Sequence, residues 1–78
     1  MLSIAQFISE GNMKFSERLV VELKASALTQ KEIAKKLHID AANITNWKKG
    51  INIPSLEVFY ELCKILDVSA DYLLGLSD

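Results

Sequence analysis

The sequence predicts an all-α fold of five short helices in a single small domain. The chain has 78 residues, below the usual domain size of about 100–150 residues. Its three Gly and one Pro leave few turns for a sandwich of short strands, while its 50% apolar content argues against intrinsic disorder. Apolar residues recur at three- and four-residue spacing between helix-start signals, and no run alternates with the period of a strand.

Three of the five helices are predicted from an apolar stripe or from terminal signals. The first covers residues 16–26 and follows large apolar side chains spaced four residues apart. These side chains are Phe15, Leu19 and Leu23. The fourth opens at Pro54–Ser55, residue types favoured where a helix begins, and it is apolar enough that we expect much of it to be buried. Ser69 caps a short fifth helix, residues 70–74, and a glycine ends it.

The second and third helices have stronger start signals and lie only about three residues apart. Thr29 and Glu32 form the T-x-x-E pattern of a capping box, and Asp40 is a suitable N-cap for a third helix that stops at Gly50. The inner faces are expected to consist of Ile33, Ala34 and Leu37 in the second helix and of Ile44 and Trp47 in the third. Two short helices joined by a tight turn predict a helix-turn-helix, whose second helix fits the major groove of DNA, about 12 Å wide.

The net charge of −1 conceals an uneven distribution of charge along the chain. Residues 14–50 contain eight basic and four acidic side chains, whereas residues 51–78 contain one basic and five acidic side chains. This asymmetry predicts one face offered to an anion and another turned away from it.

Five consecutive segments resemble the Cro/repressor-type, XRE-like helix-turn-helix family of phage and bacterial regulators. The segments are MKFSERL, LTQKEIAKKL, NITNWKKG, IPSLEVFYELCKIL and DVSADYLLG, and they span about residues 13–77. The resemblance implies a five-helix lambda-repressor-like domain that reads bases with the exposed side of its third helix. Because Met13 looks like a start typical of the family, we expect residues 1–12 to be an N-terminal extension and residues 13–78 the helix-turn-helix domain.

The expected base-reading face lies on the third helix, opposite Ile44 and Trp47. Its residues are Ala41, Ala42, Thr45, Asn46 and Lys49. Asn46 can bond to N6 and N7 of adenine, and the alanine and threonine methyl groups can meet the methyl group of thymine. The expected phosphate-binding residues are Gln30, Lys31, Asn43 and Lys48, which would position the protein without reading sequence. Gln30, at the start of the second helix, resembles the family's glutamine, which implies that it grips phosphate and braces the reading helix. Taken singly, the asparagines and Gln30 could instead be ordinary surface or helix-start residues.

Several positions depart from the family pattern. Glycine is common in the family at the turns that contain Ala27, His38 and Asp67 in this chain. These turns are therefore expected to be strained or differently shaped, because left-handed geometry is unfavourable for residues with a β-carbon. Lys48 replaces a common acidic residue, and residues 51–53 (Ile-Asn-Ile) replace common basic ones, which weakens the expected phosphate grip after the third helix.

The composition argues against several other classes of protein. A single cysteine, Cys63, and a single histidine, His38, indicate neither a disulfide scaffold, a metal site nor a Cys/His nucleophile. We therefore expect no enzyme activity, no cofactor and no metal, and a reducing cytoplasm as the location. The first residues lack the basic region of a signal peptide, and no window has about 18 unbroken apolar residues, so a membrane span is not expected.

These observations predict a sequence-specific transcriptional regulator of double-stranded DNA, expected to be a repressor that binds a palindromic operator as a homodimer. The alternative is an antitoxin-like or other protein-binding module in which DNA binding is secondary. The expected dimer interface consists of Tyr72, Leu73, Leu74 and Leu76, which are more apolar side chains than so short a helix can bury. The partly apolar residues 1–13 are a rival interface.

Overall fold

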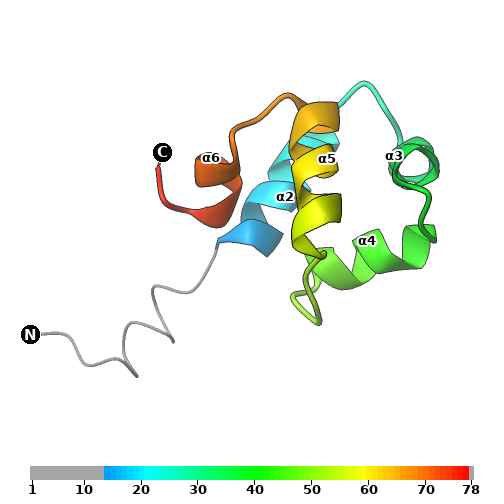
Figure 1. The fold of residues 1–78 in the computed structure, drawn as a ribbon, viewed down its shortest axis with the longest axis horizontal. Helices are drawn as coiled ribbons and strands as arrows, with labels where there is room; N and C mark the ends of the chain where they lie inside the picture. Colours follow the sequence, from blue (N-terminus) through cyan, green and yellow to red (C-terminus); the bar gives the residue numbers. More distant parts are fainter. Residues whose placement is uncertain (1–13, 78) are drawn as a thin grey trace, which may run out of the picture.

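The computed structural model describes residues 14–77, and this part of the chain contains five α-helices and no strand (Figure 1). The helices are α2 (Phe15–Ala25), α3 (Gln30–Leu37), α4 (Ala41–Lys48), α5 (Leu56–Leu66) and α6 (Ala70–Leu74). The predicted all-α, five-helix fold is therefore confirmed. The predicted N-terminal extension, residues 1–12, lies outside the described residues.

Four of the helices begin at the side-chain caps that the sequence predicts. In the capping box of α3, Oγ1 of Thr29 accepts from the N–H of Glu32 at 3.1 Å, and Oε1 of Glu32 accepts from the N–H of Thr29 at 2.9 Å. The other caps are Asp40 in α4, Ser55 in α5 and Ser69 in α6. No side chain caps α2 at Lys14, and this helix begins and ends one residue earlier than predicted.

The core receives one fully buried large side chain from each helix. These side chains are Leu19, Ile33, Ile44, Leu62 and Leu73. The ring of Phe15 meets Trp47 and Phe59 edge-on, with ring centroids 6.5 Å and 5.9 Å apart, an arrangement that aromatic pairs favour. α2 contacts α4 and α6, while α5 contacts α3 and α6, so the helix-turn-helix is anchored from two sides (Figure 1).

Four helices end in a left-handed residue. At the end of α3, the N–H of Ile39 bonds to the carbonyl of Ala34, and the N–H of His38 bonds to that of Lys35, which is the Schellman pattern. The same pattern ends α4 at Gly50, α5 at Asp67 and α6 at Gly75. His38 and Asp67 have φ of 59° and 56°, so they adopt the geometry that usually favours glycine. Ala27 does not, because α2 ends in the extended residue Ser26.

Candidate nucleic-acid interface

Side-chain hydrogen bonds hold α4 at both of its ends. Near its start, Nε2 of Gln30 donates to the carbonyl oxygen of Ala41 at 3.2 Å and to Oγ1 of Thr45 at 2.8 Å. Near its end, Oγ of Ser16 donates to the carbonyl oxygen of Trp47 at 2.6 Å. These bonds join α4 to α3 and to α2 respectively, so the helix is fixed in position and in rotation about its axis.

The rotation of α4 separates an inner side from an outer side. Ile44 and Trp47 are 0% and 4% exposed, which matches the predicted inner side. Ala42 is exposed, and Thr45 and Asn46 are half-exposed. Because residues three and four apart share one face of a helix, these three side chains form one outward strip. The strip is polar and offers hydrogen-bonding groups and methyl groups to a partner.

Two of the predicted base-reading residues lie at the edges of this strip. Ala41 is half-buried and packs against the core, so it exposes less of its methyl group than Ala42 does. Lys49 is exposed, but it follows the last residue of α4 as its C-cap.

The predicted phosphate-binding residues differ in exposure and in their contacts within the domain. Lys31 is exposed on α3, and Lys48 is half-buried in the last turn of α4. Asn43 donates from Nδ2 to the carbonyl oxygen of Asp40 at 3.2 Å, so one amide hydrogen is used within the domain. The amide of Gln30 contacts α4, as described above.

Acidic side chains near this face serve as helix caps. Backbone and side-chain hydrogen bonds from Thr29, with a smaller effect of nearby Lys36, hold the pKa of the Glu32 carboxyl below its ordinary value. The carboxylate of Asp40 accepts from the N–H of Ala42 at 2.9 Å. Carboxylates at helix starts are stabilised by the free N–H groups there. Within α3 and α4, four lysines outnumber the one glutamate, so the two helices together carry a net positive charge.

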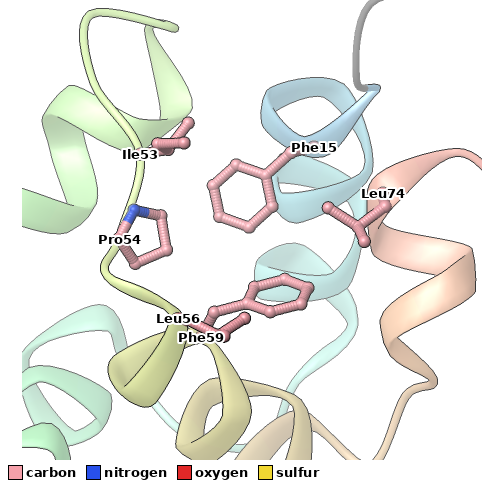
Figure 2. Close-up of a pocket in the computed structure, with 6 residues that line it drawn as sticks. All are labelled: Phe15, Ile53, Pro54, Leu56, Phe59 and Leu74. Atoms are coloured by element: carbon pink, nitrogen blue, oxygen red, sulfur yellow. The ribbon is translucent and has the colours of Figure 1, made fainter.

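The loop after α4 is apolar where the family often has basic residues. Ile51 and Ile53 are 66% and 58% exposed. Ile53 also lines a groove between this loop, α2, α5 and α6, which we name the α5–α6 groove (Figure 2). Its lining residues are Phe15, Ile53, Pro54, Leu56, Phe59 and Leu74. The surface around it is extended by Tyr60, which is 60% exposed.

The structure corrects one expectation about this apolar side. Leu73, predicted in the dimer interface, is 0% exposed and packs in the core of its own domain, so it cannot contact a partner. Much of α5 is buried against the core, as predicted, but Leu56 at its start is 84% exposed. Of the other predicted interface residues, Tyr72 and Leu74 are half-buried and Leu76 is exposed.

Tyr72 is engaged within the domain. The guanidinium of Arg18 lies 4.7 Å from the centre of its ring and donates to its backbone carbonyl oxygen at 2.6 Å. Its hydroxyl donates to a carboxylate oxygen of Glu22 at 3.1 Å, and desolvation together with this contact raises the pKa of the tyrosine. These contacts tie α6 to α2. Spacing within a single helix carries no signal for them, because the partners are 50 or more residues apart.

Within residues 14–77, no group of three or more His, Cys, Asp or Glu side chains is placed to hold a metal ion. In the same part of the chain, no helix combines the length and apolar character needed to cross a membrane. Cys63 is free and half-buried, and desolvation raises the pKa of its thiol.

The capped helix α3, the three-residue turn and the braced helix α4 together define a helix-turn-helix domain. Residues 22–73 match the family model described as Helix-turn-helix, and the chain therefore belongs to this family. The family resemblance carried by the five sequence segments is confirmed.

Named relatives are bacterial and phage regulators. The chain is 35% identical over 63 residues to the HTH-type transcriptional regulator ImmR of Bacillus subtilis, which covers 81% of this chain and 50% of ImmR. It is 30% identical over 63 residues to the cryptic phage CTXphi transcriptional repressor RstR of Vibrio cholerae, covering 81% and 56% of the two chains. The chain spans about half the length of these curated relatives.

A solved structure supports the same fold. The SOS-response transcriptional repressor LexA of Eubacterium rectale superposes with a TM-score of 0.71 and 32% identity, over 77% of this chain and 64% of that one. This likeness confirms the predicted lambda-repressor-like arrangement of helices.

Proposed function

We propose that this domain binds double-stranded DNA in a sequence-specific manner as part of a transcriptional regulator that represses its target. The observation that carries the proposal is the orientation of α4, whose inner side is locked into the core and whose outer side is polar. A helix held in this way can enter the major groove without further ordering. RstR and LexA are both named transcriptional repressors, which supports repression as the proposed role. This role needs no catalysis, and the cytoplasm is its proposed location.

The proposed contacts divide into base reading and phosphate binding. Asn46 offers its amide to adenine, while the methyl groups of Ala42 and Thr45 offer contact to the methyl group of thymine. The other proposed base-reading residues are Ala41 and Lys49. Phosphate contacts are proposed for Gln30, Lys31, Asn43 and Lys48, and they fix the register of the domain on the duplex. A half-site containing A·T pairs is the expected target.

The proposed active form is a homodimer on a palindromic operator. A large exposed leucine, Leu56, lies at the α5–α6 groove, and Tyr60 and Leu76 add further exposed apolar surface. Apolar surface of this kind is typical of protein–protein contacts, and two copies related by a two-fold axis would cover it. The two α4 helices would then meet half-sites about 10 base pairs apart.

The same groove favours a second candidate function, in which the domain binds another protein as an antitoxin-like module does. The C-terminal part of the described chain, residues 51–77, is acidic as well as apolar at its surface, and such a surface suits a basic partner. DNA binding would then be secondary.

Selection of binding sites from random DNA tests the proposed function. A regulator of the proposed kind enriches a palindrome with half-sites about one helical turn apart, and insertion of about 5 base pairs between them abolishes cooperative binding. Leu56→Glu should yield monomers by analytical ultracentrifugation and weaken binding to the palindrome, with the melting temperature unchanged. If the wild-type protein enriches no sequence, the proposed function is wrong. If it enriches only single half-sites and sediments as a monomer, the homodimer is wrong.

A further inference from the structure

The amide group of Gln30 holds α4 with both of its hydrogens. Nε2 lies 3.2 Å from the carbonyl oxygen of Ala41 and 2.8 Å from Oγ1 of Thr45. A carbonyl oxygen can only accept, so the nitrogen of the amide, and not Oε1, must face Ala41. An NH₂ group has two hydrogens, and each of them has one acceptor here. The orientation of the amide is therefore determined by its surroundings.

The same contacts determine the polarity of the Thr45 hydroxyl. A threonine in a helix can donate its hydroxyl hydrogen to the carbonyl four residues earlier, which is that of Ala41. That carbonyl already accepts from Gln30 and, as a regular member of α4, from the backbone N–H of Thr45, so its two lone pairs are filled. Among the side-chain hydrogen bonds of residues 14–77, none has Thr45 as the donor. The oxygen is engaged, and the hydroxyl hydrogen is left free for an acceptor outside the domain.

We propose that the hydrogen bond from Gln30 orients the hydroxyl of Thr45 so that this hydroxyl donates to a base edge. Thr45 is then a specificity-determining residue, and Gln30 is its positioning residue. The inference rests on the proposed function, in which α4 enters the major groove. There, purine N7, guanine O6 and thymine O4 are acceptors, whereas cytosine presents only its amino group, which is a donor. A hydroxyl fixed as a donor can therefore bond to adenine, guanine or thymine at the position that it faces, but it cannot bond to cytosine there.

This arrangement also changes the role expected of Gln30. With both amide hydrogens on α4, the side chain retains only the acceptor Oε1, and a phosphate oxygen is an acceptor too. The side chain therefore cannot donate to phosphate while it holds α4. Its backbone N–H, in the first turn of α3 where amides lack partners within the helix, is the group that suits a phosphate contact.

Binding measurements on single-base variants of the selected half-site test this inference. Thr45→Val keeps the size and one methyl group but removes the hydroxyl. It should lose discrimination against cytosine at one position by about 2- to 10-fold, the range of one hydrogen bond, and keep its preferences elsewhere. Thr45→Ser, the matched control, retains the hydroxyl and should keep the discrimination. Gln30→Ala should lose it at the same position, because the hydroxyl can then rotate.

Gln30→Glu provides a sharper test because it replaces the donor with an acceptor. The Thr45 hydroxyl would then donate inward to the carboxylate and present its oxygen to the base. The preference at that position should move toward bases with an amino group, cytosine or adenine, relative to the wild type. Circular dichroism melting establishes which variants are folded, and Thr45→Val remains informative if the glutamate variant is not.

The outcomes separate this inference from the proposed function. If the wild type selects a site but Thr45→Val and Gln30→Ala leave every base preference unchanged, the orientation of Thr45 is wrong while the proposed function stands. If Gln30→Ala weakens all sites equally, Gln30 serves only to hold α4, and the inference is overturned. If the wild type selects no site, the proposed function itself fails.

Discussion

The helices α3 and α4 and the helices α5 and α6 present different surfaces on the same kind of scaffold. Each helix begins at a side-chain cap, ends in a left-handed residue and contributes one fully buried side chain. Outside, the first pair is polar and rich in lysine, whereas the second pair exposes Leu56 and Tyr60. The fold therefore depends on caps and inner positions, and each outer surface is left free for a different partner.

The largest expected effect concerns the inner positions that both pairs share. Ile44→Ala in α4 and Leu62→Ala in α5 should each lower the free energy of unfolding by about 2–5 kcal/mol, because both side chains are 0% exposed and their removal leaves a cavity. Val21→Ala, at a position 55% exposed, is the control and should stay within about 0.5 kcal/mol of the wild type. Urea denaturation measures all three. If only one of the two substitutions, Ile44→Ala or Leu62→Ala, caused a large loss of stability, the two helix pairs would not share one core.

Two substitutions in the polar pair, α3 and α4, should distinguish base reading from phosphate binding. Asn46→Ala should weaken binding to the selected site by about 1–3 kcal/mol and relax the preference at one base pair, with little change on random DNA. Lys31→Ala should weaken binding to all DNA and reduce the slope of log affinity against log salt by about one. Titrations at several salt concentrations distinguish the two. Equal losses of Asn46→Ala on both DNAs would mean that Asn46 reads no base.

A smaller effect is expected at the two left-handed helix ends that have no glycine, His38 and Asp67. His38→Gly should stabilise the domain by about 0.5–1 kcal/mol, because relief of about 1–2 kcal/mol of backbone strain is partly offset by about 0.4–1 kcal/mol of added freedom in the unfolded chain. Asp67→Gly should gain less, since aspartate tolerates this conformation better than most residues. Thermal melting measures both variants. Destabilisation by His38→Gly would indicate a stabilising contact of the imidazole.

The smallest effect is a pH dependence from the capping box. Bonds from Thr29 lower the pKa of Glu32 below its ordinary value of 4.5 in the folded domain. The charged carboxylate therefore adds stability above that value, and the contribution is lost as the pH falls through the lowered pKa. From about pH 5.5 to about pH 3.5, the melting temperature of the wild type should fall more steeply than that of Glu32→Gln. Parallel curves would show that the charge of Glu32 contributes nothing.

Local signals explain which parts of the fold could be predicted from the sequence. Caps at Thr29, Asp40, Ser55 and Ser69 act on neighbouring N–H groups, so they determine where helices begin without any tertiary contact. The inner side of α4 follows from the helical spacing of Ile44 and Trp47. The start of α2 has no side-chain cap, which is why its prediction was displaced by one residue.

Contacts between helices could not be predicted in this way. The family resemblance implies that Gln30 braces the reading helix, but its two acceptors lie 11 and 15 positions away and are identified only by the packing of α3 on α4. The spacing also could not show which apolar residues face outward where a helix is apolar on most sides. Leu73 was therefore expected outside and lies inside, while Leu56 lies outside. Such choices depend on which neighbouring helix covers which side.

The contact between Lys14 and Gly75 means that the described chain closes on itself. A β-carbon at position 75 would lie 3.1 Å from Cγ of Lys14, and Arg18 donates to the carbonyl oxygen of Ser77, so the first and last helices are neighbours (Figure 1). A short peptide could join these ends, and new ends could be opened between α4 and α5. Circular permutation is best tolerated where chain ends lie close together and the new ends open in an exposed loop. A domain permuted in this way would keep the packing of its helices in a new order along the chain, and it would carry the helix-turn-helix at its end as an intact unit.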